Sequence, residues 1–184
     1  ENVGGLVFVD VTERSGTGDT GSGRGVAFAD VDHDGDLDLY VANEGQANKM
    51  YENVGGLVFV DVTERSGTGD AGSGRGVAFA DVDHDGDLDL YVANEGQANK
   101  MYANDHGGVD DWLMVRALDV NGHPTLHGAS VRVLVTGTGA LVGLRTIDGG
   151  SGYCSQNSYD VHFGLGHFSQ QKYVDVVSIS GLRA

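Results

Sequence analysis

The sequence contains one cysteine and one proline in 184 residues, and both scarcities limit what the chain can be. A single cysteine, Cys154, excludes an internal disulfide framework. With so little proline, the turns must be made by asparagine, aspartate and the 31 glycines, which suits an all-β protein with many tight hairpins. No apolar run approaches the roughly 18 residues that a membrane-spanning helix needs.

Basic residues are also few, with 11 lysines and arginines against 27 acidic residues and a formal net charge of −16. The acidity is uneven, because residues 1–102 hold 20 acidic and only 6 basic side chains. Such a surface repels nucleic acid and anionic lipid, so neither is an expected partner.

The acidic part is an internal duplication. Residues 1–51 and 52–102 are the same unit and differ only at Thr20 and Ala71. A period near 50 residues indicates a propeller or a repeat array. Because residues 1–5 recur as residues 52–56, the chain begins inside a repeat, and we expect a fragment or processed piece of a longer protein. The lack of a signal peptide is then no evidence for a cytosolic location.

Each unit contains one acidic nonapeptide, at residues 30–38 and 81–89, with five carboxylates. At an effective dielectric of roughly 20, two such charges about 4 Å apart repel by on the order of 4 kcal/mol, so the loops favour a hard cation. Positions 1, 3, 5 and 9 offer side-chain oxygens, position 7 can offer its backbone carbonyl, and the glycine at position 6 permits a sharp turn, which are features of a calcium loop. The predicted Ca²⁺ ligands are Asp30, Asp32, Asp34, Asp36, Asp38, Asp81, Asp83, Asp85, Asp87 and Asp89.

The nonapeptide has two other interpretations. An EF-hand needs a bidentate glutamate at position 12 and flanking helices, but position 12 is Val41 or Val92, and the residues after the loop alternate with period two, as in a strand. A solvated acidic turn that binds nothing would have to tolerate the repulsion without compensation.

The pattern Asp-x-Asp-x-Asp-Gly-x-x-Asp, preceded by Gly-x-Gly-Val-Ala-Phe and followed by Asp-Leu-Tyr-Val-Ala-Asn, resembles the FG-GAP/VCBS repeat. That resemblance implies β-propeller-type blades with calcium in a hairpin loop. Residues 25–63 would form one whole blade and residues 76–103 a blade without its outer strand. Residues 3–12 would form an outer strand that could complete the last blade.

Two blades cannot close a ring, since propellers typically have four to eight. Missing blades, the C-terminal domain or a second copy of the chain could cover the open faces. We favour truncation from a longer propeller over an oligomer of two-blade pieces.

After Tyr102 the composition changes. Residues 104–110 read as a linker between the repeat region, residues 1–103, and a second domain, residues 111–184. The second domain shows strand-like alternation at residues 112–118, 129–135, 141–147, 159–163 and 173–179, which predicts a small β-sandwich or barrel.

This second domain resembles the ASPIC/UnbV domain, which commonly follows such repeats, as in the cartilage acidic protein group. The residues that carry the resemblance are Asp-Trp-Leu-x-Val at 111–115, Gly-Ala-Ser-Val-Arg-Val at 128–133, Asp-Gly-Gly-Ser-Gly-Tyr at 148–153, Gln-Asn-Ser at 156–158 and His-Phe-Gly-Leu-Gly at 162–166. The family's closing Trp-Pro is absent from residues 174–181, which leaves the end of that sheet less well specified.

The sequence also predicts the placement of several side chains that are not expected to bind the metal. Trp112 is expected to anchor the second core and Cys154 to be a small buried residue. His33 and His84, at position 4 of each loop, are expected to point away from the metal into solvent. Arg24 and Arg75 are either counter-charges beside the loops or simply exposed.

The search for catalytic or other binding groups finds little, and we expect no enzyme. Residues 16–21 fit Gly-x-Gly-x-x-Gly, but a strand follows instead of the helix that a dinucleotide site needs. Cys154 with His162 or His167 could form a nucleophile–base pair, although nothing supplies an orienting acid. His123 and His127 have a helical metal spacing inside a sequence that does not favour a helix.

The polar segments 148–153 and 156–158 form a further candidate site. They either bind a sugar or protein partner or form a hairpin with side-chain caps.

The sequence therefore predicts an extracellular, calcium-binding module, secreted or at the cell surface, for protein or glycan interaction in matrix or cell adhesion. Weak extracellular-type calcium sites would stay empty at cytosolic calcium levels. The alternatives are a non-catalytic accessory domain of a larger secreted polysaccharide-active enzyme and a self-assembling acidic scaffold.

Overall fold

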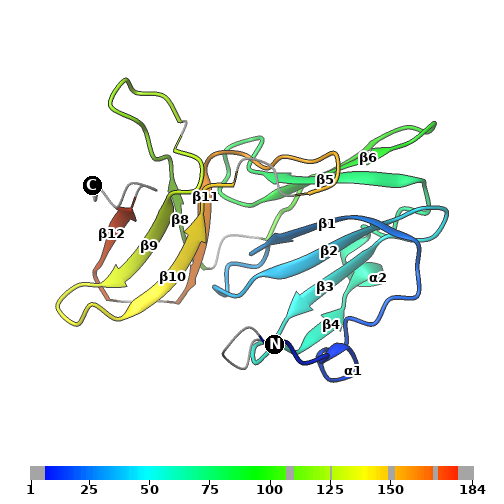
Figure 1. The fold of residues 1–184 in the computed structure, drawn as a ribbon, viewed down its shortest axis with the longest axis horizontal. Coiled ribbons are helices and arrows are strands. Elements are labelled where there is room, and N and C mark those ends of the chain that lie inside the picture. Colours follow the sequence, from blue (N-terminus) through cyan, green and yellow to red (C-terminus); the bar gives the residue numbers. More distant parts are fainter. Residues whose placement is uncertain (1–6, 107–109, 125, 149–151, 168–169, 178–184) are drawn as a thin grey trace.

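The computed structural model describes residues 7–106, 110–124, 126–148, 152–167 and 170–177. Apart from two four-residue helices, its regular structure consists of antiparallel strands, so the all-β prediction is confirmed. The two repeat sheets lie together, and the C-terminal strands pack beside them (Figure 1). In the part of the chain that is described, no helix is long and apolar enough to cross a membrane.

The repeat region forms two meandering sheets, as predicted for one complete blade and one that lacks its outer strand. The first has the order β1–β2–β3–β4 and the second the order β5–β6–β7. The strands of the first are β1 (Gly23–Ala29), β2 (Asp38–Asn43), β3 (Lys49–Asn53) and β4 (Phe59–Asp61). Those of the second are β5 (Gly74–Ala80), β6 (Asp89–Asn94) and β7 (Lys100–Tyr102).

The segment before each blade differs from the prediction. Of the outer strand expected at residues 3–12, the described part from Val7 onward is not a strand except for one bridge residue, Phe8, so this segment does not complete the second sheet. Two short helices, α1 (Thr12–Ser15) and α2 (Thr63–Ser66), lie where no helix was expected. The cause is local, because Asp10 Oδ1 accepts a hydrogen bond of 2.9 Å from the Thr12 N–H and turns the chain.

The two repeat sheets pack face to face and share one apolar core. Ala27 and Ala29 of β1 are buried together with Val77 and Phe79 of β5. A Cβ at Gly25 would lie 2.4 Å from the Arg75 carbonyl oxygen, so this close approach of the sheets requires glycine. The other buried members of the core are Tyr40, Ala42, Met50, Val62, Leu90 and Val92.

Because the repeats are nearly identical, equivalent side chains can be compared directly. At four equivalent positions, the large apolar side chain is 42–52% exposed in one repeat and 0–5% exposed in the other. Two of the exposed side chains belong to each repeat. The exposed residues are Val26, Phe28, Tyr91 and Met101, and their buried equivalents are Val77, Phe79, Tyr40 and Met50. Each repeat sheet therefore exposes the face whose equivalent in the other repeat sheet is buried.

The C-terminal strands form two small sheets around a second core, with the orders β10–β9–β12 and β11–β8. Their members are β8 (Asp111–Val115), β9 (Ser130–Val135), β10 (Leu141–Thr146), β11 (Val161–Gly166) and β12 (Lys172–Val177). Val131 and Val133 are fully buried on one face of β9, and Phe163 meets them from β11. The arrangement matches the predicted sandwich-like region.

Two core predictions in this region are wrong. Trp112 is 42% exposed, and its ring lies over Gly86 of the second acidic loop instead of entering the C-terminal core. Cys154 is exposed, in a loop where its φ is 53°. Both side chains sit where the C-terminal part meets the repeats, a position that the pattern along one strand does not reveal.

The polar segment near residue 155 has a structural role. Ser155 Oγ accepts a 2.7 Å hydrogen bond from the Val77 N–H, and Asn157 Oδ1 accepts one of 3.2 Å from the Phe79 N–H. These side chains satisfy donors on the free edge of β5, which an unpaired strand would otherwise leave open. Residues 149–151 of the predicted polar cluster lie outside the described residues.

Candidate metal centres

Each acidic loop connects the first two strands of its sheet, and its shape repeats closely. In the first loop the Asp34 and Asp36 N–H groups donate to the carboxylates two residues earlier, at 3.3 and 2.8 Å, and Gly35 has φ 98°. The second loop makes the same turns at 3.3 and 2.9 Å, and Gly86 has φ 101°. The glycine at position 6 is thus required by a left-handed backbone, as the sequence predicted.

Within each loop the structure brings three of the five predicted carboxylates together. In each group the ligand oxygens lie within 4.8 Å of one another, and among the described residues these are the two clusters of this kind. The first consists of Asp30, Asp32 and Asp34, and the second of Asp81, Asp83 and Asp89. Close oxygens from one tight loop are the donor set that Ca²⁺ takes in proteins.

The remaining carboxylates are placed differently. Asp36 and Asp85 are exposed at the loop surface. Asp38 is buried at the start of β2, where its oxygens accept hydrogen bonds from the Val31 and Asn53 N–H groups at 2.9 and 2.8 Å. Asp87 turns its carboxylate out of the loop.

Asn53 has an equivalent, Asn104, whose N–H donates to Asp89 at 3.0 Å. These asparagines were missed by the sequence reasoning. The signal was available, since both follow their aspartate by 15 residues.

Burial disfavours the charged form of two loop carboxylates. Desolvation raises the pKa of Asp38 to about 7, although two backbone N–H donors oppose the shift. Desolvation also raises the pKa of Asp30, against the Gly164 N–H and the Arg145 guanidinium. A bound cation would reverse this preference by supplying the missing positive charge.

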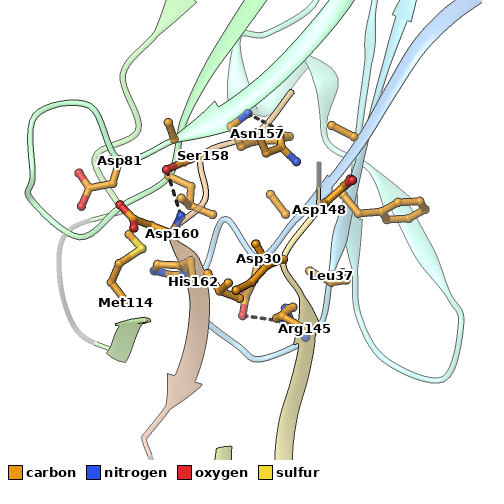
Figure 2. Close-up of a pocket in the computed structure, with 18 of the residues that line it drawn as sticks. Asp30, Leu37, Asp81, Met114, Arg145, Asp148, Asn157, Ser158, Asp160 and His162 are labelled. Carbon is orange, nitrogen blue, oxygen red and sulfur yellow. Dashed lines mark hydrogen bonds and ion pairs between the residues drawn. The ribbon is translucent and has the colours of Figure 1, made fainter. Parts of the chain in front are cut away.

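The first loop forms hydrogen bonds and an ion pair with the C-terminal part. Asp30 Oδ2 accepts a 2.8 Å hydrogen bond from the Gly164 N–H of β11 and lies 3.7 Å from the Arg145 guanidinium of β10. Figure 2 shows Asp30 facing Arg145, with His162 beside them. The Gly166 N–H donates to the His33 carbonyl at 2.8 Å. Neither Gly164 nor Arg145 was predicted to contact a loop, because their partners lie more than 100 residues away in the sequence.

The second loop meets different groups. The Trp112 ring covers Gly86, and His162 Nε2 lies 3.0 Å from the Gly86 carbonyl oxygen. Burial, followed by the neighbouring His33, lowers the pKa of His162 to about 4. Identical loop sequences therefore occupy two different environments.

The prediction that both loop histidines face solvent is wrong for one of them and confirmed for the other. His33 is fully buried, not solvent-facing, because the C-terminal strands close over the first loop. Its twin His84 is exposed, as expected. Arg24 and Arg75 are not counter-charges of the loops, since Arg24 pairs with Glu44 and Arg75 bridges Glu44 and Glu95.

The other candidate pairs have separate partners. His162 faces Gly86, His167 Nδ1 lies 3.4 Å from Asp110, and Cys154 is exposed. His123 Nδ1 is 3.8 Å from Asp119, whereas the His127 ring contacts Tyr159.

A cavity of about 750 Å³ opens between the repeats and the C-terminal part (Figure 2). Its wall combines apolar surface from Phe28 and Trp112 with the polar side chains of Arg145, Asn157 and Asp160.

Comparison with known proteins agrees with this architecture. Residues 30–92 match the sequence model of the FG-GAP-like repeat, and residues 120–180 match that of ASPIC and UnbV. Cartilage acidic protein 1 of Xenopus tropicalis is 36% identical over 98 residues, which is 53% of this chain and 15% of that protein. The Homo sapiens protein is 32% identical over 107 residues, which is 56% of this chain and 16% of that protein.

The matched stretch thus spans well under a fifth of the length of these relatives. This chain combines an FG-GAP-like repeat region with an ASPIC and UnbV region, and over about half its length it is similar to cartilage acidic protein 1.

Proposed function

We propose that the chain is an extracellular matrix module whose two acidic loops each bind one structural Ca²⁺. The convergence of three carboxylates in each of two equivalent hairpin loops carries this proposal. The similarity to cartilage acidic protein 1 supports the matrix setting.

In each loop the three converged carboxylates would supply the first oxygens. The carboxylates of Asp38 and Asp85, and the backbone carbonyls of Asp36 and Asp87, would complete the two sets. Asp38 can bind a metal while it accepts its two hydrogen bonds, because a carboxylate has about four lone-pair sites.

The expected stabilisation is modest. Extracellular modules bind calcium with Kd of roughly 10⁻⁴ M or weaker. At about 1 mM calcium, each occupied site then adds on the order of 1.4 kcal/mol to the free energy of unfolding. Two sites would raise the melting temperature by roughly 5–10 °C for a chain of this size.

The test is a thermal melt of the full chain with calcium and with a chelator. The Asp32→Asn/Asp83→Asn double variant removes one converged carboxylate from each loop and should lose most of the calcium-dependent rise. Glu13→Gln/Glu64→Gln is the matched control, because it removes two exposed charges from equivalent positions outside the loops. The proposal fails if calcium leaves the melting temperature of the parent chain unchanged.

We propose a binding role, not catalysis, for the module, with a protein or glycan partner. The cavity beside the loops supports this, since its wall pairs the Trp112 ring with the polar side chains of Asn157 and Asp160. Sugars and peptides are bound by such mixtures of aromatic and hydrogen-bonding groups.

We further propose that the two repeat sheets belong to a β-propeller in which a further repeat of the same sequence covers the open face of the second sheet, where Tyr91 and Met101 are exposed. The internal interface supports this, because each open face has a buried twin within the chain. A head-to-tail contact of this kind is heterologous and closes only as a ring. The covering repeat could come from a longer chain or from another copy of this chain, and light scattering on the purified chain distinguishes the two. A monomer points to a longer chain, and a closed oligomer points to other copies.

A further inference from the structure

Three histidines meet where the two loops and the C-terminal part converge. His33 comes from the first loop, His106 follows β7, and His162 lies on β11. The ring centroid of His33 is 5.4 Å from that of His106 and 4.9 Å from that of His162. The rings of His106 and His162 each lie against that of His33, so three segments distant in the sequence contribute to one histidine cluster.

Four ring nitrogens of this cluster are buried without a hydrogen-bond partner among the described residues. His33 is fully buried, and neither of its ring nitrogens has such a partner in the part of the chain that the structure describes. The same is true of His162 Nδ1, in a residue only 7% exposed, and of His106 Nε2. Buried polar atoms are normally paired, and leaving one unpaired costs about 1–3 kcal/mol. Two of the four atoms, His33 Nε2 and His106 Nε2, have a carboxylate at 3.4 and 3.5 Å, and a bound cation would satisfy all four nitrogens.

A carboxylate faces the cluster. Asp87 Oδ1 lies 3.4 Å from His33 Nε2, and Asp87 Oδ2 accepts a 2.8 Å hydrogen bond from the His106 N–H. A second carboxylate, that of Asp110, lies 3.5 Å from His106 Nε2. Negative charge is therefore available beside the unpaired nitrogens.

The surroundings of His162 orient one nitrogen inward. With Nε2 donating to the Gly86 carbonyl oxygen at 3.0 Å, the proton stays on Nε2, and Nδ1 is left as a free electron-pair donor. Metal-binding histidines commonly donate their second N–H to a backbone carbonyl in this way. The Trp112 ring stacks on His162 with centroids 6.1 Å apart, which holds the ring plane.

We propose that His33, His106 and His162 bind a first-row transition metal ion, zinc in the first instance, with Asp87 as the fourth ligand. Tetrahedral zinc with Zn–N distances of about 2.0–2.1 Å holds the centroids of two ligand rings about 5 Å apart, close to both measured separations. The site is chemically distinct from the calcium loops, because imidazole nitrogen suits zinc and carboxylate oxygen suits calcium.

Binding requires the ligand side chains to move. Unlike the loop carboxylates, these ligand atoms do not converge within 4.8 Å as a group. We expect the half-buried His106 side chain and the buried Asp87 side chain to rotate toward the ion on binding. Such a site would join both repeats to the C-terminal part through one ion.

The test is a zinc titration of the full chain by calorimetry, with the loops saturated by calcium. We expect one high-affinity zinc per chain, and His33→Gln or His162→Gln should each weaken it by about 10-fold or more. The matched control is His84→Gln, which changes the same residue in the same loop motif where it is exposed. Cobalt substitution should give the intense visible bands of a tetrahedral site in the parent chain and in His84→Gln.

The proposal is overturned if zinc fails to bind, or if His33→Gln binds it as tightly as His84→Gln does. Circular dichroism checks that the variants fold. If the two buried substitutions unfold the chain, His106→Gln at the partly exposed ligand decides the matter, and undiminished zinc binding by that variant overturns the proposal.

Discussion

Phe28 and Phe79 are the same residue in the same strand of two identical repeats, yet they differ in exposure. Phe28 is 52% exposed, whereas Phe79 is 5% exposed between the two sheets. Substituting each with alanine separates the effect of tertiary packing from that of local sequence, because the residues around both positions are the same.

The expected losses of stability differ several-fold. Truncating a buried phenylalanine to alanine typically costs about 3–5 kcal/mol, through lost transfer free energy and the cavity left behind. Phe28 already has half its surface in water, so Phe28→Ala should cost roughly 1 kcal/mol or less. The free energies of unfolding of the two variants should therefore differ by at least about 2 kcal/mol.

The assay is urea denaturation of both variants and the parent chain in saturating calcium, followed by far-ultraviolet circular dichroism. Unchanged slopes against urea would show that the difference lies in stability and not in compactness. Equal losses for the two variants would refute the asymmetric packing of the sheets. They would also remove the packing argument that supports a further repeat.

Two further predictions concern the loops. Trp112 is the only tryptophan and lies over Gly86, so its fluorescence should change when calcium fills the second loop. Asp83→Asn should abolish that change and Asp32→Asn should leave it intact, and the reverse pattern would contradict the contact. In calcium-free buffer, the folded chain should bind more protons than the unfolded chain between pH 3.8 and about 7, because burial raises the pKa of Asp38 to about 7. The free energy of unfolding contributed by Asp38 should thus fall as pH rises through that window. His162, with its lowered pKa, contributes the opposite slope between about 4 and 6.5. The comparison of the parent chain with Asp38→Asn isolates the aspartate, and identical pH profiles would contradict its burial.

Much of the architecture could be predicted because its signals are local. Alternating apolar residues mark the strands, and a 51-residue duplication marks the blades. The left-handed turn at Gly35 and Gly86 follows from a nonapeptide that specifies its own shape through hydrogen bonds two residues apart. The short helices were missed because four residues are too few to show a helical period.

The sequence by itself determined the strands, the duplicated blades and two equivalent acidic loops, because these depend on residues close together in the chain. It could not distinguish His33 from His84, which have the same neighbours on both sides. Only the tertiary structure decided that one is buried among histidines and the other exposed, because the C-terminal strands pack over the first loop. The placements of Trp112 and Cys154 depended on the same long-range contacts, which no local pattern encodes.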